Sequence, residues 1–159
     1  MGYKFTSRAA LDTAVDLWIY SKSDAQSTYG HIRNWDVSRI TDFSALFRDK
    51  TTFNQDIGDW DVSSGRTFYR MFYNAQSFNQ DIGNWDVSSA INFRAMFDSA
   101  QSFNQDIGDW DVSSATNLNH MFTNAYVFNK DIGDWDVSSV KDFSSMFLNA
   151  DAFNQDIGD

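Results

Sequence analysis

The stretch FNQDIGDWDVSSGRTFYRMFYNAQS, residues 53–77, decides the fold, because the chain is built from copies of it. Its first residue, Phe53, and its tryptophan, Trp60, both recur every 25 residues along the chain. We number each copy from position 1, the recurring Phe, to position 25. Three further complete copies follow, a degenerate copy occupies residues 28–52, and the chain ends in the beginning of a sixth. Repeats of this length are typical of chains that stack successive units, because one unit alone cannot bury its apolar face.

Two different periodicities occur inside each copy. The Trp and Val at positions 8 and 10 alternate with polar residues, which is typical of a half-buried strand. Apolar residues at positions 16, 19, 20 and 23 follow the spacing of one helix face, and this helix has room for only about ten residues. We therefore expect an α/β repeat solenoid in which short parallel strands and short helices stack, with the Trp, Phe and Met side chains as its core.

The N-terminal part of the chain differs from the repeats. Residues 7–21 carry apolar side chains at helical spacing, and residues 23–26 resemble a capping box that starts a second short helix. The ends of a solenoid need a cap, so residues 1–29 are expected to form an N-terminal helical cap. Residues 30–159 are then expected to form a solenoid of about five repeats whose C-terminal end is uncapped.

The composition argues against several classes of function. The chain has 22 Asp, no Glu, no Cys and 12 Lys and Arg, which gives a formal net charge of −10. Because phosphate contacts require Lys and Arg, nucleic acid is not an expected partner, and anionic membrane surfaces are disfavoured for the same reason. No apolar run reaches the ~20 residues that span a bilayer, so membrane insertion is not expected. The absence of Cys removes disulfides and thiolate zinc sites but leaves the compartment undetermined.

The repeat carries the motif FNxDIxxWDVSS, preceded by Met-Phe, over about residues 30–159. This motif resembles the 25-residue repeats of the BspA-like leucine-rich-repeat surface proteins, which also occur in surface lipoproteins of mycoplasmas. The resemblance implies a right-handed, leucine-rich-repeat-like solenoid. It also implies a cell-surface or extracellular setting and a role in adhesion or protein binding, without naming a partner.

Catalytic residues are not expected. The two histidines, His31 and His120, lie in different copies and at different positions of the repeat. Without Cys or Glu there is little from which to build a nucleophile and its base. Paired Asp side chains can act as acid and base, but this needs two distinct environments, whereas repeats make identical ones. The chain is therefore expected to have no enzymatic activity and no required cofactor.

Aspartates form the sharpest pattern outside the apolar positions. If positions 8 and 10 lie on a strand and face inward, positions 7 and 9 line its outer face in rows. Three interpretations stay open: turn-forming and solubilising carboxylates, which we favour; calcium held between coils; and an acidic surface that meets a partner. The candidate cation or partner surface consists of Asp36, Asp61, Asp86, Asp111 and Asp136 at position 9, and Asp59, Asp109 and Asp134 at position 7.

A protein-binding or scaffold module is the expected function, with cell-surface adhesion as the setting that the family resemblance implies. Self-association is the first alternative, because an open last coil would expose Phe147, Phe153 and Ile157, where a second copy can dock to form a homodimer. Calcium binding along the Asp rows is the second alternative. The outward positions of the expected helices differ between copies, and we interpret them as solvated exterior.

Overall fold

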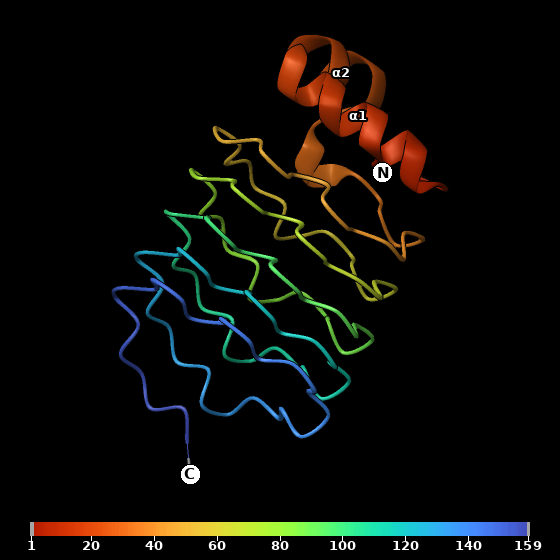
Figure 1. Ribbon diagram of the computed structural model, residues 1–159. Coiled ribbons are helices and arrows are strands. Elements are labelled where there is room, and N and C mark those ends of the chain that lie inside the picture. The colour runs from red at the N-terminus through yellow and green to blue at the C-terminus, as the bar shows by residue number, and fades with distance from the viewer. Residues whose placement is uncertain (1, 159) are drawn as a thin grey trace.

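The computed structural model describes residues 2–158 and shows two helices followed by a stack of coils (Figure 1). Helix α1 spans Arg8–Tyr20, α2 spans Lys22–Tyr29, and a short 3-10 turn, η1, spans Ile32–Asn34. Both α-helices fall within the N-terminal stretch for which helices were predicted. After η1 the chain winds in successive coils of one repeat each, stacked from the helices toward the C-terminus (Figure 1).

The predicted α/β repeat solenoid is wrong. Within residues 2–158, the repeats contain no α-helix and no strand longer than an isolated bridge. The bridges between coils are parallel, but they lie at position 15 rather than at the Trp and Val where the strand was expected. The right-handed, leucine-rich-repeat-like arrangement of strands and helices is therefore not observed. The bridged pairs of the repeats are Asp42–Thr67, Thr67–Asn92, Asn92–Asn117 and Asn117–Asp142.

The segment predicted as a helix is a row of turns whose amides alternate between two kinds of partner. Amides at positions 16, 18, 20 and 22 donate to carbonyls of the next coil, as the Phe72 amide does to the Met96 carbonyl at 2.9 Å. Amides at positions 19, 21 and 23 donate to the carbonyl three residues back, as the Met71 amide does to the Phe68 carbonyl at 3.0 Å. Half of the amides that an α-helix would use for itself therefore bind the neighbouring coil.

Left-handed backbone at positions 18 and 22 explains why no helix forms. Every coil has a positive φ at both positions, and a right-handed helix requires φ near −63° at each residue. Asn at position 22 tolerates this conformation better than most residues. The residues with positive φ in the repeats are Ala45, Asp49, Arg70, Asn74, Ala95, Ser99, His120, Asn124, Ser145 and Asn149.

Replacing Ser145 by Gly is expected to stabilise the fold by about 1 kcal/mol, because Gly adopts positive φ without the steric cost of a Cβ atom. Ser145 is exposed and has a φ of 57°, so the substitution removes little else. Urea-induced unfolding measures the change. The matched control is Ser102→Gly, at an exposed serine without positive φ, which is expected to be neutral or destabilising. Equal destabilisation by both substitutions would contradict the left-handed backbone conformation of Ser145.

Ladders of aromatic rings fill the interior of the stack. Phe97 is fully buried and stacks on Phe103 of its neighbouring turn at 4.0 Å between ring centroids, and on Phe72 of the preceding coil at 5.6 Å. The Trp ladder adds hydrogen bonds, because each indole from Trp60 to Trp135 donates to a position 5 carbonyl of the preceding coil, as Trp85 does to Ile57 at 3.2 Å. The rings therefore bury apolar surface and also fix the register between coils.

An asparagine ladder runs along position 2 of the repeat and was missed by the sequence analysis. The side-chain oxygen of Asn54 accepts from the backbone amide of Asn79 at 3.0 Å and from the side chain of Gln80 at 2.8 Å. The same backbone contact recurs from Asn79 to Asn104 and onward to the last coil. The recurrence of Asn at position 2 of every full copy is the signal in the sequence that could have indicated this ladder.

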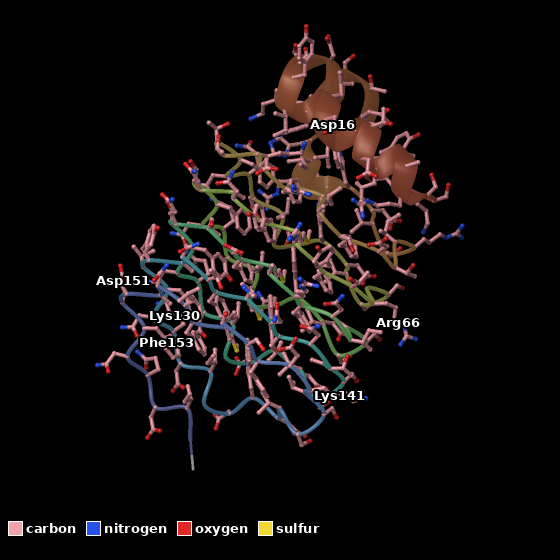
Figure 2. The ribbon with its side chains drawn as sticks, in the orientation of Figure 1. Asp16, Arg66, Lys130, Lys141, Asp151 and Phe153 are labelled. Carbon is pink, nitrogen blue, oxygen red and sulfur yellow. The ribbon has the colours of Figure 1, made fainter. Side chains whose placement is uncertain are left out.

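The N-terminal helices lie against the first coil. Trp18 of α1 packs edge-on against Trp35 at 5.8 Å between ring centroids. The segment before α1 pairs with the coil, since the Phe5 amide donates to the Asp36 carbonyl at 2.9 Å. Lys50 of the coil forms an ion pair with Asp16 at 2.7 Å, and Figure 2 labels Asp16 on the helical part. Between residues 2 and 158, no helix is long and apolar enough to cross a bilayer.

Candidate binding face

The position 9 aspartates close turns within their own coils. Asp111 Oδ1 accepts from the backbone amide of Ser113 at 3.0 Å and from its hydroxyl at 2.6 Å. The amide contact recurs at Asp36, Asp61, Asp86 and Asp136. These carboxylates therefore act as side-chain acceptors in turns, which offsets the repulsion between like charges on successive coils.

Hydrogen bonds to the ionised form lower the pKa of several of these carboxyl groups. The Ser38 hydroxyl, followed by Lys4 at 3.0 Å, lowers the pKa of Asp36 to about 2. The same kind of contact, with Ser113 and Ser138, lowers the pKa of Asp111 and Asp136.

Stability is therefore expected to fall on acidification from about pH 4 to about pH 2. A carboxyl group whose folded pKa lies below its unfolded value of ~3.9 stabilises the fold above that value, and the contribution is lost as pH falls through the folded pKa. Asp98 contributes to the pH dependence of stability with the opposite sign, because burial raises its pKa. Thermal unfolding followed across this pH range measures the effect. Asp36→Asn is expected to make the pH dependence shallower, and an unchanged profile would contradict the role of the Asp36 contacts.

The position 7 aspartates have a different environment. All three are exposed, and Asp59 in addition forms an ion pair with Arg33 at 3.2 Å. In the part of the chain that the structure describes, no three Asp or His side chains gather closely enough to hold a metal ion. Calcium binding along the rows stays a prediction. A melting temperature that does not differ between excess calcium and excess chelator would contradict it.

The residues predicted as a self-association edge lie in the last coil. Phe147 and Phe153 stack on each other at 4.2 Å between centroids and continue the two inner Phe ladders. Figure 2 labels Phe153 near the C-terminal end of the stack. Ile157 is 59% exposed and lines a shallow hollow together with Phe147 and Phe143. The structure thus places apolar side chains at this end, and only part of their surface is covered.

The two histidines lie three coils apart. His31 contacts the edge of Trp18 at 5.2 Å between ring centroids, and its ring accepts from the Arg33 amide. His120 is hydrogen-bonded to the side chain of its neighbour Asn119. Each histidine therefore has a local partner in its own coil, and the structure does not bring the two together.

A second feature that sequence reasoning missed is a cluster of Tyr and Arg on the outward side of the row of turns. Positions 17, 18 and 21 of successive coils meet there. Arg70 lies between two rings, with its guanidinium 5.1 Å from the centroids of both Tyr69 and Tyr73. Arg48 lies over Tyr73 at 5.5 Å, and Arg94 lies over Tyr69 at 5.7 Å. We call Arg48, Tyr69, Arg70, Tyr73 and Arg94 the Tyr–Arg cluster.

Arg70 is the least satisfied member of the Tyr–Arg cluster. Its Nε atom is buried and has no hydrogen-bond partner in the part of the chain described here. Arg48, by contrast, binds Asp49 at 3.1 Å. Asp98 lies within charge-interaction range of Arg70, but its carboxylate accepts from the Ser99 hydroxyl at 2.9 Å. Arg70 is therefore positioned by aromatic rings and lacks a close acceptor.

The cluster has the composition of a recognition surface. Tyr and Arg are enriched among the residues that contribute most to protein–protein binding, because they combine a large contact area with polar groups. Cation–π contacts hold the three guanidinium groups in place before any partner arrives. The cluster also gathers three arginines beside two aspartates, Asp49 and Asp98, on a chain whose formal net charge is −10. It can therefore attract a local anionic group that the rest of the chain would repel.

Comparison with known proteins gives one family and no individual relative. The family described as "Mycoplasma protein of unknown function, DUF285" matches residues 16–128 and residues 90–159. The two matches together cover nearly all of the coils and part of the N-terminal helices, in agreement with a tandem repeat. No curated protein and no solved structure matches the chain.

Proposed function

The chain belongs to the DUF285 family, whose members are described as Mycoplasma proteins of unknown function, and we propose that it is a non-enzymatic module that binds a protein partner through the Tyr–Arg cluster. One observation carries this proposal. The positions that build the interior are nearly identical between copies, whereas positions 17, 18 and 21 differ from coil to coil. Where they differ, two Tyr and three Arg converge from three successive coils.

Variation on the surface of a repeat stack is what recognition of an irregular partner requires. A partner surface without periodicity can be matched only by side chains that change along the stack. The constant interior supplies a rigid support, because each coil is hydrogen-bonded to the next at four positions of the row of turns. The resemblance to BspA-like surface proteins supports a cell-surface setting for this binding, and adhesion as its outcome.

Site-specific photo-crosslinking tests the proposal. A photoreactive phenylalanine analogue replaces Tyr73 in the cluster or, as the matched control, the exposed Tyr126 outside the cluster. Both variants are irradiated with surface proteins from the cells that carry the protein. We expect adducts from the Tyr73 variant that disappear with excess unmodified protein. Adducts of equal yield from both positions, or none that the excess protein removes, would rule out the Tyr–Arg cluster as the binding face.

Self-association is a second candidate, supported by the exposed apolar side chains of the last coil. Phe143, Leu148 and Ile157 are 44%, 52% and 59% exposed. Covering such surface with a second copy would remove apolar area from water. Sedimentation equilibrium is expected to show a dimer whose population rises with concentration and falls in Phe143→Ser. A monomer at every concentration would refute this second candidate.

A further inference from the structure

We propose that the Tyr–Arg cluster recognises an extended acidic segment of the protein partner, with side-chain carboxylates of that segment binding Arg70 and the two flanking arginines. The inference rests on the proposed protein-binding function and adds the chemistry of the partner. It assigns a role to a half-buried cation that neither the coil stack nor the N-terminal helices use.

The environment of the Arg70 guanidinium is the first reason to expect an acidic partner. The guanidinium lies between Tyr69 and Tyr73, and its buried Nε has no acceptor among residues 2–158. Only the Nε atom is buried without a partner, so the two Nη groups of Arg70 remain accessible from outside. A carboxylate that binds these groups offsets the hydration that the half-buried guanidinium has lost. A carboxylate suits this role, because its two oxygens match the planar donors of a guanidinium in a bidentate pair.

The spacing of the arginines indicates the shape of the partner. Arg48, Arg70 and Arg94 come from three successive coils, and successive coils are 5.4–5.6 Å apart, measured between the stacked rings of the inner Phe ladder. Alternate residues of an extended chain lie about 6.6–6.8 Å apart on the same side. Arg48, Arg70 and Arg94 stand at positions 21, 18 and 17 of their coils, so their side chains also differ in place along the row of turns. An extended segment with acidic residues at every second position follows the succession of coils most closely, and the long, flexible Arg side chains can bridge the remaining difference.

The charge of the whole chain favours a short acidic segment over a long polyanion. The cluster holds three arginines, whereas the formal net charge of the chain is −10. Two carboxylates lie beside the cluster, but Asp49 is paired with Arg48 and Asp98 accepts from the Ser99 hydroxyl. Repulsion from more distant Asp residues is screened beyond about 8 Å at physiological ionic strength, so a short segment on the cluster is tolerated. A long sulfated polysaccharide would extend past the three arginines onto the surface of a chain with a net charge of −10, where its charges are repelled.

Fluorescence anisotropy with two labelled peptides tests the proposal on the full chain. The probe peptide alternates Glu and Ser over seven residues, and its partner peptide has Gln in place of each Glu. The variants are Arg70→Gln in the cluster and, as the matched control, Arg66→Gln. Arg66 is an exposed arginine that Figure 2 shows at the edge of the stack. Thermal unfolding of each variant verifies that the fold is intact.

We expect the Glu peptide to bind, at least tenfold weaker binding to Arg70→Gln, and unchanged binding to Arg66→Gln. Arg70→Lys should recover only part of the loss, because an ammonium lacks the planar pair of donors. The proposal is overturned if the Glu peptide does not bind the unmodified chain, or if the Gln peptide binds it equally well. It is also overturned if Arg70→Gln and Arg66→Gln bind the Glu peptide with the same affinity. Binding of heparin without binding of the Glu peptide also overturns it, in favour of a polyanion.

The crosslinking experiment separates failure of this inference from failure of the proposed function. If the Tyr73 position still yields competed adducts when Arg70 is Gln, a protein partner binds the cluster without using the Arg70 charge. That result overturns the acidic segment and leaves the binding module standing. If the Tyr73 position yields no competed adducts in the otherwise unmodified chain, the binding module itself fails.

Discussion

Replacing Phe97 by Ala is expected to lower the free energy of unfolding by about 3–5 kcal/mol, because it opens a cavity in the interior of the stack. Phe97 is fully buried. Its ring contacts Phe103 at 4.0 Å, Phe72 at 5.6 Å and Phe122 at 5.7 Å between centroids. The substitution therefore interrupts two stacking directions at once, one within the coil and one between coils.

Urea unfolding monitored by tryptophan fluorescence measures the effect of Phe97→Ala. The control is Val127→Ala, at a side chain that is 43% exposed and is expected to cost far less. Because each coil contacts only its neighbours, a break in the middle of the stack is also expected to broaden the transition. A loss below about 1 kcal/mol would contradict the contribution of the Phe ladder.

Replacing Gly83 by Ala is expected to destabilise the fold by about 1–3 kcal/mol, because the added methyl group does not fit between two coils. A Cβ atom on Gly83 would lie 2.7 Å from the backbone oxygen of Asp106 in the next coil. That oxygen belongs to the main chain and cannot rotate away. Gly83 has no positive φ, so the requirement for Gly comes from the close approach of two coils.

The same substitution at Gly133 provides an internal comparison for Gly83→Ala. A Cβ atom on Gly133 would meet the backbone oxygen of Asp156 at 2.9 Å, but this contact lies in the last coil. This approach is looser than the 2.7 Å at Gly83, so a smaller shift relieves it, and the expected cost is smaller. Equal destabilisation by the two substitutions in thermal or urea unfolding would contradict the explanation from coil spacing.

The sequence predicts the repeat and the interior correctly and fails on the backbone. Phe68, Met71, Phe72 and Ala75 are all buried, as their helical spacing requires. A row of turns with left-handed residues at Arg70 and Asn74 places the same four positions inward, so periodicity cannot separate the two backbones. Asn at position 22 was a weak signal for the turns.

The Tyr–Arg cluster could not be predicted for a different reason. Arg48, Tyr69 and Arg94 are each more than 20 residues apart, and only the register between coils brings them together. Register depends on which amides bind which carbonyls of the next coil. The residue periodicity of a single sequence does not contain that information. Under the predicted helix, the same residues were interpreted as solvated exterior.

The hydrogen bonds between coils are the feature from which the fold and the binding face both follow. Couplings between 15N and 13C′ nuclei transmitted through hydrogen bonds identify each donor and acceptor pair directly. We expect a coupling from the Phe72 nitrogen to the carbonyl carbon of Met96, and from the Phe97 nitrogen to the carbonyl carbon of Met121. In both pairs the amide nitrogen lies 2.9 Å from the carbonyl oxygen. A coupling from the Phe72 nitrogen to the carbonyl carbon of Phe68, as in an α-helix, would contradict the stack of turns and the cluster built on it.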